Sequence, residues 1–264
     1  MDIAFIVREF IDKYNYRDPI FIEELNLDKS QNNARDYELY KLEYKGIIRQ
    51  YQKGIYYKPK VTRFGELGID KEKLIEYKYL KNKDGKVEGY ITGPSVWYNL
   101  NITTQVPRNK WIVSNKVNHT KIEDDLFIKV FAPKKKINDK LVKYFLLLDI
   151  IDQCRKIQDM NNKKYDEFIM NTIKGYKSED FLIIKRLSKD YDRFVRRVLG
   201  MYIEILYNNC FKYNFIEDLN LEYNKKLIET LELVYNDLKS SVSADEKYYY
   251  RVINDDIKKG WGLY

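Results

Sequence analysis

The chain has 264 residues, a formal net charge of +8 at pH 7 and 44% apolar residues. This length allows one large or two ordinary domains, and the apolar content argues against long disordered stretches because it can build a core. Two cysteines and one histidine, His119, exclude a disulfide framework and a site built from several histidines. The 25 tyrosines predict cores and interfaces lined by tyrosine, since the ring is large and apolar while the hydroxyl is polar.

The apolar stretches of the chain do not predict a membrane protein. The opening residues, "MDIAFIVREF", contain no cleavable apolar run and therefore no signal peptide. The most apolar stretch, residues 141–151, is interrupted by Lys143 and Asp149 and is too short to span a bilayer, so it predicts a buried helix. Cys154 and Cys210 lie in apolar segments with helical spacing and are expected to be reduced core residues. A cytoplasmic protein without a membrane partner is expected.

Residues 1–62 predict a winged helix-turn-helix. Three helices are expected, over residues 2–13, over residues 20–25, and from Ser30 or Asn32 to Lys45. The second helix is predicted because Asp18 followed by Pro19 is typical of a helix start, and Gly46 is typical of the residue after a helix. The stretch "GIIRQYQKGIYYKPK", residues 46–60, then predicts two strands joined by a tight turn. Three helices followed by a two-stranded ribbon are typical of this DNA-binding motif.

The remaining chain predicts a mixed region followed by helices. Apolar periodicity gives helices over 69–80 and 93–101 and strands within 82–91, 110–115, 117–123 and 126–133. Further helices are expected over 140–158, 163–175, 178–190, 192–212, 219–240 and 244–257. The expected fold class is therefore α+β, with a winged helix-turn-helix (1–62), a mixed α/β region (63–138) and a helical C-terminal region (139–264). A single domain over residues 63–264 is the alternative.

Positive charge is concentrated on the predicted ribbon. Residues 46–63 contain no acidic residue and five basic ones, which gives +5: Arg49, Lys53, Lys58, Lys60 and Arg63. Residues 1–45 hold seven basic and ten acidic residues, which gives −3. Cations on a ribbon beside a recognition helix would lie along the phosphates of a duplex.

The third predicted helix has a polar, tyrosine-rich face. Leu39 and Leu42 are expected to face inward, which leaves Tyr44 and its neighbours outward. Asn side chains can pair with adenine edges, while Tyr and Lys can reach phosphates. The predicted DNA contacts are Asn32, Asn33, Tyr37, Tyr40, Lys41, Arg49, Tyr51, Lys53, Lys58 and Lys60. Two alternatives remain: a solvated edge protected against strand pairing, or a protein-interaction module.

Three stretches carry a resemblance to a known family. They are "GIIRQYQKGIYYKPK" (46–60), "GYITGPSVWYNLNITTQVPRNKWIVSN" (89–115) and "YDRFVRRVLGMYIE" (191–204). With them the chain resembles, over roughly residues 1–210, the AbiEi-like antitoxins of type IV toxin–antitoxin systems in bacterial abortive infection. The resemblance implies a non-enzymatic repressor that binds inverted repeats in its own promoter. It also implies that the C-terminal region counters a nucleotidyltransferase-like toxin without a stable complex.

The remaining candidates for chemistry are weaker. Glu123, Asp124 and Asp125 precede a predicted strand and could hold Mg²⁺ in a nuclease, or could form a solvated turn. A metal-dependent nucleic-acid-processing enzyme with a winged-helix targeting module is therefore the alternative function. No GxxxxGK[ST] or GxGxxG motif is present, so no cofactor is expected. His119 is expected to be structural or at the surface.

A second basic patch is predicted in the C-terminal region. Arg193, Arg196 and Arg197 lie at positions i, i+3 and i+4 of a predicted helix and so share one face. Such a patch could bind RNA, a second DNA segment or an acidic partner. The alternative is that these arginines pair with Asp190, Asp192 or neighbouring helices.

Overall fold

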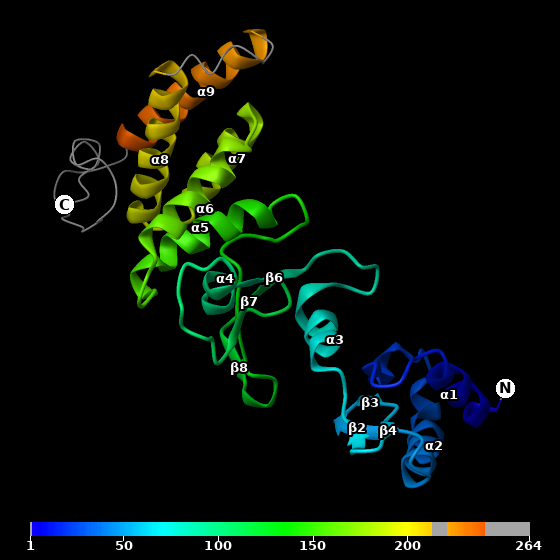
Figure 1. Ribbon diagram of the computed structural model, residues 1–264. Helices are drawn as coiled ribbons and strands as arrows, with labels where there is room; N and C mark the ends of the chain where they lie inside the picture. The colour runs from blue at the N-terminus through cyan, green and yellow to red at the C-terminus, as the bar shows by residue number, and fades with distance from the viewer. Residues whose placement is uncertain (1, 213–220, 241–264) are drawn as a thin grey trace. The chain divides into compact units, whose positions relative to one another are not determined.

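The chain has a mixed α+β fold made of two compact units, Met1–Lys83 and Asp84–Tyr264 (Figure 1). The structure, a computed structural model, describes residues 2–212 and 221–240, and only their backbone at 209–212, 221–224 and 240. The helix expected over 244–257 lies outside these residues.

The first unit contains two α-helices, short 3-10 turns and two small sheets, followed by a third helix. Its helices are α1 (Ile3–Asp12), α2 (Asn32–Tyr44) and α3 (Lys71–Ile75), the last continued by a π-helical turn (Glu76–Leu80). Its strands are β1 (Ile20–Phe21), β2 (Arg49–Gln52), β3 (Ile55–Tyr57), β4 (Lys60–Thr62) and β5 (Gly65–Leu67).

One buried cluster in the first unit is wholly aliphatic. Helices α1 and α2 pack against each other, and a three-stranded antiparallel sheet has the order β1-β3-β2. The predicted inward position of Leu39 and Leu42 on the third predicted helix, here α2, is confirmed. The buried cluster consists of Val7, Ile11, Ile20, Ile22, Leu25, Leu39, Leu42 and Ile48.

The predicted helix over residues 20–25 is wrong. Ile20 and Phe21 instead form strand β1, which pairs with Tyr56 and Ile55 of β3, and a 3-10 turn (Ile22–Glu24) follows. Asp18 does not cap a helix, because its carboxylate accepts from the backbone N–H of Asn15 and pairs with Lys73 Nζ at 2.5 Å. The open edge of the β2–β3 hairpin therefore overrides the local Asp-Pro signal, since it offers the backbone a long-range pairing.

A second hairpin, β4–β5, follows the predicted one and was not expected from the sequence. Lys60 pairs with Leu67 and Thr62 with Gly65, so that residues 63 and 64 form the turn. Gly65 has φ +110°, a conformation that favours glycine. This hairpin and α3 belong to the first unit, so the first domain boundary lies after Lys83 rather than after residue 62.

The second unit contains a mixed sheet, a short helix and five longer helices among the described residues. The strands are β6 (Gly89–Thr92), β7 (Lys110–Ser114), β8 (Lys121–Glu123) and β9 (Ile128–Phe131). The helices are α4 (Pro94–Asn99), α5 (Val142–Gln153), α6 (Asn162–Lys174), α7 (Ser178–Ser188), α8 (Arg193–Lys212) and α9 (Leu221–Ser240). Each has the type that its stretch of sequence predicted.

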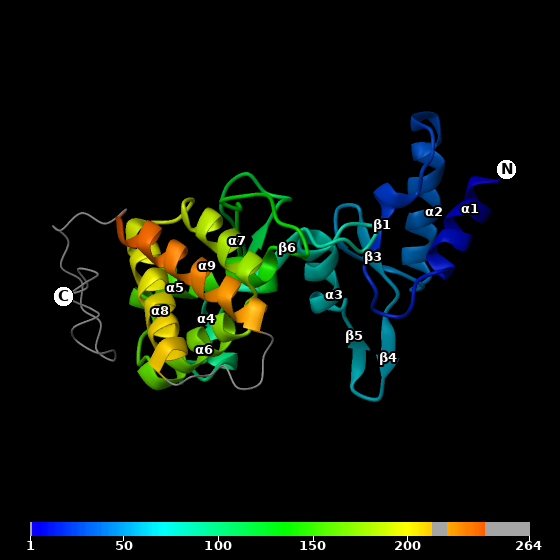
Figure 2. The ribbon, with the colours of Figure 1, turned by 90° about the horizontal axis from the view of Figure 1, so that it is seen from above.

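The sheet of the second unit has the order β6-β7-β9-β8, with β7 and β9 parallel and the outer pairs antiparallel. Helix α5 contacts β6 as well as α7 and α8, so it lies between the sheet and the other helices, and α8 runs beside α9 (Figure 2). One buried cluster extends from Tyr90 of the sheet to Leu238 of α9. Because sheet and helices share this core, residue 138 is not a domain boundary.

Helix α5 comes from the most apolar stretch of the chain and is buried as expected. Tyr144, Phe145, Leu147, Leu148 and Ile150 are all inaccessible or nearly so. Within residues 2–212 and 221–240, no helix combines the length and the apolar character needed to cross a bilayer.

Candidate nucleic-acid interface

One face of α2 is exposed and rich in tyrosine. Asn33, Tyr37, Tyr40 and Tyr44 follow one another at intervals of four, three and four residues, which places them on one side of the helix. All four are exposed, and Tyr44 is 83% exposed. The predicted exposure of this face is therefore confirmed, whereas its contact with DNA stays a prediction.

Side chains on this face interact with one another. The rings of Tyr40 and Tyr44 stack with centroids 6.4 Å apart. Lys41 Nζ lies 4.3 Å from the centre of the Tyr37 ring and 3.4 Å from Glu38 Oε2, so its charge is partly neutralised within the helix. Asn32 is half-buried at the start of the helix. The face therefore presents mainly hydroxyls, aromatic rings and one amide, and little free positive charge.

An ion pair between an exposed arginine of α1 and a buried carboxylate of α2 joins the two helices. Glu38 is buried on α2, and its Oε1 accepts from Arg8 Nε of α1 at 2.8 Å and lies 2.7 Å from Nη2. Burial alone would raise the pKa of Glu38, but the hydrogen bonds from Arg8 and Lys41 hold this pKa below its usual value of 4.5. The carboxylate is therefore ionised at neutral pH and sets the position of the tyrosine face.

The predicted hairpin is formed by β2 and β3, and Lys53 lies exposed at its turn. Gly54 in this turn has φ +80°. Tyr51 is half-buried at an irregularity in the strand pairing between Gln50 and Gln52. Lys60, which follows the hairpin, is exposed as well. Both lysines can therefore reach an anionic partner.

Two of the predicted DNA contacts have other partners in the structure. The Arg49 guanidinium makes two hydrogen bonds to Glu66 of β5, at 3.1 and 3.2 Å, which tie the second hairpin to β2. The Lys58 side chain is only 14% exposed and lies 3.5 Å from Asp12. The expected exposure of Lys58 is therefore wrong, while its contact with DNA stays a prediction, and Arg49 is largely neutralised by Glu66.

The second hairpin adds a surface that the sequence reasoning missed. Phe64 at its turn is 85% exposed, and Val61 is exposed beside it. The guanidinium carbon of Arg63 lies 4.6 Å from the centre of the Phe64 ring. Among the residues described, Lys53, Lys60 and Arg63 have no ion pair. The alternation in "KVTRFGEL" and the glycine after the turn were the available sequence signal.

The second basic patch does not form as predicted. Arg193 is exposed and Arg196 is half-buried, but Arg197 has 0% of its surface exposed. The cause is that α8 contacts α5, α6, α7 and α9, so a face shared by residues at i, i+3 and i+4 cannot lie wholly in solvent. Arg197 is a core residue and not part of a surface patch.

The other sequence candidates are spread out. Glu123 pairs with Lys121 at 2.5 Å, and nowhere in the described part of the chain do three or more His, Cys, Asp or Glu side chains gather as metal ligands. His119 is exposed. Cys154 is buried as a free thiol, as expected, whereas the side chain of Cys210 lies outside the described residues.

Comparison with known proteins gives no family for this chain. No protein-family model matches it, and no curated protein matches it.

Proposed function

We propose that the chain is a DNA-binding autorepressor and antitoxin of a type IV toxin–antitoxin system that counters a nucleotidyltransferase-like toxin. One observation carries the DNA-binding part. Three cations without ion pairs among the described residues, Lys53, Lys60 and Arg63, lie in the same compact unit as an exposed face of tyrosine and asparagine.

The order of elements in the first unit supports a winged-helix interpretation. A short strand, β1, pairs with β3 of the hairpin, and α2 precedes that hairpin. In winged helices the helix before the ribbon enters the major groove, and the ribbon follows the backbone or the minor groove. Here the second helix would be shortened to 3-10 turns, Ile22–Glu24 and Lys29–Gln31.

The proposed mechanism separates positioning from base recognition. Lys53, Lys60 and Arg63 neutralise phosphates, which fixes the orientation of the unit without reading sequence. Asn33 reads a base edge, and the hydroxyls of Tyr40 and Tyr44 donate to phosphates. An operator made of inverted repeats would bind two copies of the chain.

The DNA-binding part is tested with the gene's own upstream DNA. Fluorescence anisotropy with wild-type protein over a range of salt concentrations should give a steep loss of affinity with salt, of about 0.9 in log–log slope per phosphate neutralised. The double variant Lys53→Glu/Lys60→Glu should not bind. A matched double reversal in the second unit, Lys140→Glu/Lys163→Glu, changes net charge equally and should bind almost as the wild type does. Equal binding by both variants would remove the proposed interface.

The antitoxin part is tested in cells. Co-expression of the chain with the nucleotidyltransferase-like protein encoded beside its gene should restore growth that the toxin alone prevents. The Lys53→Glu/Lys60→Glu variant should still restore growth when expressed from a foreign promoter, because the resemblance assigns neutralisation to the C-terminal region. Growth arrest in the presence of wild-type chain would refute this part.

A protein-binding role is the second candidate, because Phe64 at the turn of the second hairpin and Val61 on its strand β4 are both exposed. Exposed aromatic and aliphatic side chains are frequent at protein interfaces. The variant Phe64→Ser separates the two roles when it is compared on operator DNA and in growth rescue. Loss of rescue with full DNA binding would favour the protein-binding role.

A further inference from the structure

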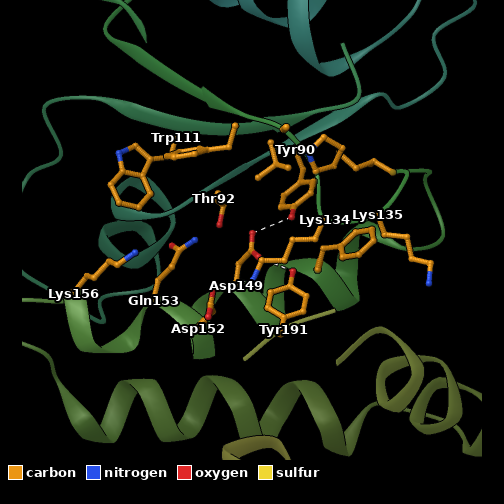
Figure 3. Close-up of a pocket in the computed structure, with 16 residues that line it drawn as sticks. Tyr90, Thr92, Trp111, Lys134, Lys135, Asp149, Asp152, Gln153, Lys156 and Tyr191 are labelled. Atoms are coloured by element: carbon orange, nitrogen blue, oxygen red, sulfur yellow. Dashed lines mark hydrogen bonds and ion pairs between the residues drawn. The ribbon is translucent and has the colours of Figure 1, made fainter. Parts of the chain in front are cut away.

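The second unit contains a hollow between its sheet and α5 (Figure 3). Its cavity volume is about 210 Å³. That is smaller than the ~300–1,000 Å³ typical of sites for drug-sized ligands, so it suits a single ring system. Strands β6 and β7 supply Thr92 and Trp111, and α5 supplies Asp149 and Gln153.

The inner end of the hollow is rich in hydrogen-bond acceptors. Asp149 is 5% exposed, and its carboxylate accepts from the hydroxyls of Tyr90 at 2.9 Å and Tyr191 at 2.7 Å. Gln153 Oε1 is buried without a hydrogen-bond partner, and the Thr92 hydroxyl, in a side chain that is 1% exposed, has no hydrogen bond of regular geometry. The buried Gln153 oxygen without a donor is costly, so this end favours a ligand that brings an N–H group to it.

Trp111 gives the hollow a flat aromatic wall. A Cβ atom at Gly93 would lie 2.5 Å from the Trp111 ring, so the ring can pack there only because residue 93 is glycine. Trp97 and Phe131 contact the same ring edge to face, with centroids 5.8 and 5.5 Å away. The ring is therefore fixed in place, and a rigid ring is a suitable platform for a flat ligand.

An adjacent hollow of about 400 Å³ shares Trp111 and Lys156 with the first. Arg108 also lines it, and both Lys156 and Arg108 are exposed. Neither cation has an ion pair in the parts of the chain that the structure describes. These two side chains can bind an anionic group, whereas Lys134 at the inner end is already paired with Asp152 at 3.1 Å.

We propose that the two adjacent hollows bind a nucleotide. The base lies against Trp111 with its N–H edge toward Gln153 and Asp149, and the phosphate lies toward Lys156 and Arg108. The ligand is either a free nucleoside phosphate or a nucleotide within a single strand, since both present the same base and phosphate. This site lies wholly in the second unit and does not depend on DNA binding by the first.

The first test is titration calorimetry on the full chain with nucleoside monophosphates, the matching nucleosides and inorganic phosphate. A monophosphate should bind about tenfold more tightly than its nucleoside, because only the monophosphate reaches Lys156 and Arg108. Binding should also change the tryptophan fluorescence, because Trp111 forms the wall. The absence of binding at millimolar concentration by all monophosphates and by a short single-stranded oligonucleotide would overturn the proposal.

Two variants locate the ligand. Gln153→Leu should weaken the monophosphate and the nucleoside alike, about three- to tenfold, because an acceptor for the base is lost. Lys156→Ala should weaken only the monophosphate, about tenfold. Lys140→Ala removes an exposed cation of the same unit outside both hollows and should have no effect. Circular dichroism should first show that all variants are folded. The site would be overturned if Lys156→Ala and Lys140→Ala bound the monophosphate equally well and Gln153→Leu bound it as the wild type does.

The same variants separate the two sources of the nucleotide. If the monophosphate binds and Lys156→Ala weakens this binding, the ligand is a free nucleotide. Binding of the oligonucleotide alone, weakened by Gln153→Leu, indicates a nucleotide within a strand. Binding of the operator duplex, measured in the same variants, should remain at the wild-type level, so a failed operator test and a failed nucleotide test are distinguishable.

Discussion

Tyrosine has opposite roles in the two units. In the second unit buried tyrosines donate to carboxylates: Tyr90 and Tyr191 to Asp149, Tyr144 to Asp180, and Tyr202 to Asp166. In the first unit Tyr37, Tyr40 and Tyr44 are exposed on α2. A partner stabilises a buried hydroxyl, and these four find a carboxylate, although the Tyr176 hydroxyl of the same core is buried without a hydrogen bond. The exposed rings of α2 leave their hydroxyls available to another molecule, whereas elsewhere in the first unit Tyr79 is buried and Tyr14 donates to Glu24.

The buried clusters of the two units also differ in their aromatic content. The buried cluster of the first unit is wholly aliphatic, whereas that of the second includes tryptophan, tyrosine and phenylalanine. A small unit buries a smaller fraction of its surface and has less stability to lose. A given loss of free energy in the first core should therefore unfold its unit more readily than the same loss in the second.

The largest effect is expected from Leu39→Ala in the first unit. Leu39 is buried on α2, and the cavity left by the substitution should lower the free energy of unfolding of this unit by about 2–5 kcal/mol. All three tryptophans lie after residue 83, so their fluorescence reports the second unit alone. Chemical denaturation followed by far-UV circular dichroism should show an earlier first transition, while the fluorescence transition should not change.

The matched control for this prediction is Ile47→Ala, which also shortens an aliphatic side chain of the first unit but at an exposed position. It should change the same free energy by less than about 0.5 kcal/mol. A fluorescence transition that moves together with the circular dichroism signal in Leu39→Ala would show that the units do not unfold separately.

The next effect compares tyrosines directly. Tyr191→Phe removes one of the donors to the buried carboxylate of Asp149 and should cost about 1.5–3 kcal/mol, the usual contribution of a hydrogen bond to a charged group. Tyr44→Phe removes an exposed hydroxyl and should stay within about 0.5 kcal/mol. Urea denaturation of both variants measures the difference, and equal costs would contradict the two roles assigned to tyrosine.

Two carboxylates should give the units opposite responses to pH. The pKa of Glu38 is lowered in the folded first unit, so its contribution is present above pH 4.5 and is lost as the pH falls through the lowered pKa. Burial raises the pKa of Asp149 above its usual 3.8, so its contribution falls as the pH rises through the raised pKa. Glu38→Gln should therefore be destabilising at pH 7, and the cost measured by denaturation should shrink as the pH falls below 4.5.

The control for the pH prediction is Asp149→Asn, for which the order reverses. The free energy of unfolding of this variant, relative to that of the wild type, should be higher at pH 7 than at pH 3, because the variant has no charge to bury. Parallel pH profiles for the two variants would be inconsistent with the environments of Glu38 and Asp149.

The element types were largely predictable because apolar periodicity is a local property. Residues 32–44 place Leu39 and Leu42 three residues apart, as the inward side of a helix requires, and residues 110–114 show the β-branched and aromatic pattern of a strand. The failure at residues 20–25 came from a long-range pairing of Ile20 with Tyr56, which no local signal contains. The charge count found Lys53 and Lys60, but it could not show that Lys58 pairs with Asp12.

The acceptor-rich hollow was the least predictable feature. Asp149 was visible as a charge within an apolar run, but its partners Tyr90 and Tyr191 lie 59 and 42 residues away in sequence. Only the packing of β6 and α5 brings Tyr90 and Asp149 together. Sites assembled from several elements leave little pattern in a single sequence, whereas the exposed face of one helix can be predicted from its period.

The smallest effect, and the sharpest test of the comparison, is expected from Tyr40→Phe combined with Tyr44→Phe. The rings stay stacked and α2 keeps its stability, because neither hydroxyl is needed for packing. If these hydroxyls donate to operator phosphates, each should contribute about 0.5–1.5 kcal/mol, so the double variant should bind operator DNA about 5- to 150-fold more weakly at fixed salt. The salt slope should stay at the wild-type value, because no cation is removed. A reduced salt slope, or an unchanged affinity, would mean that the exposed tyrosines of the first unit are not its DNA-binding surface.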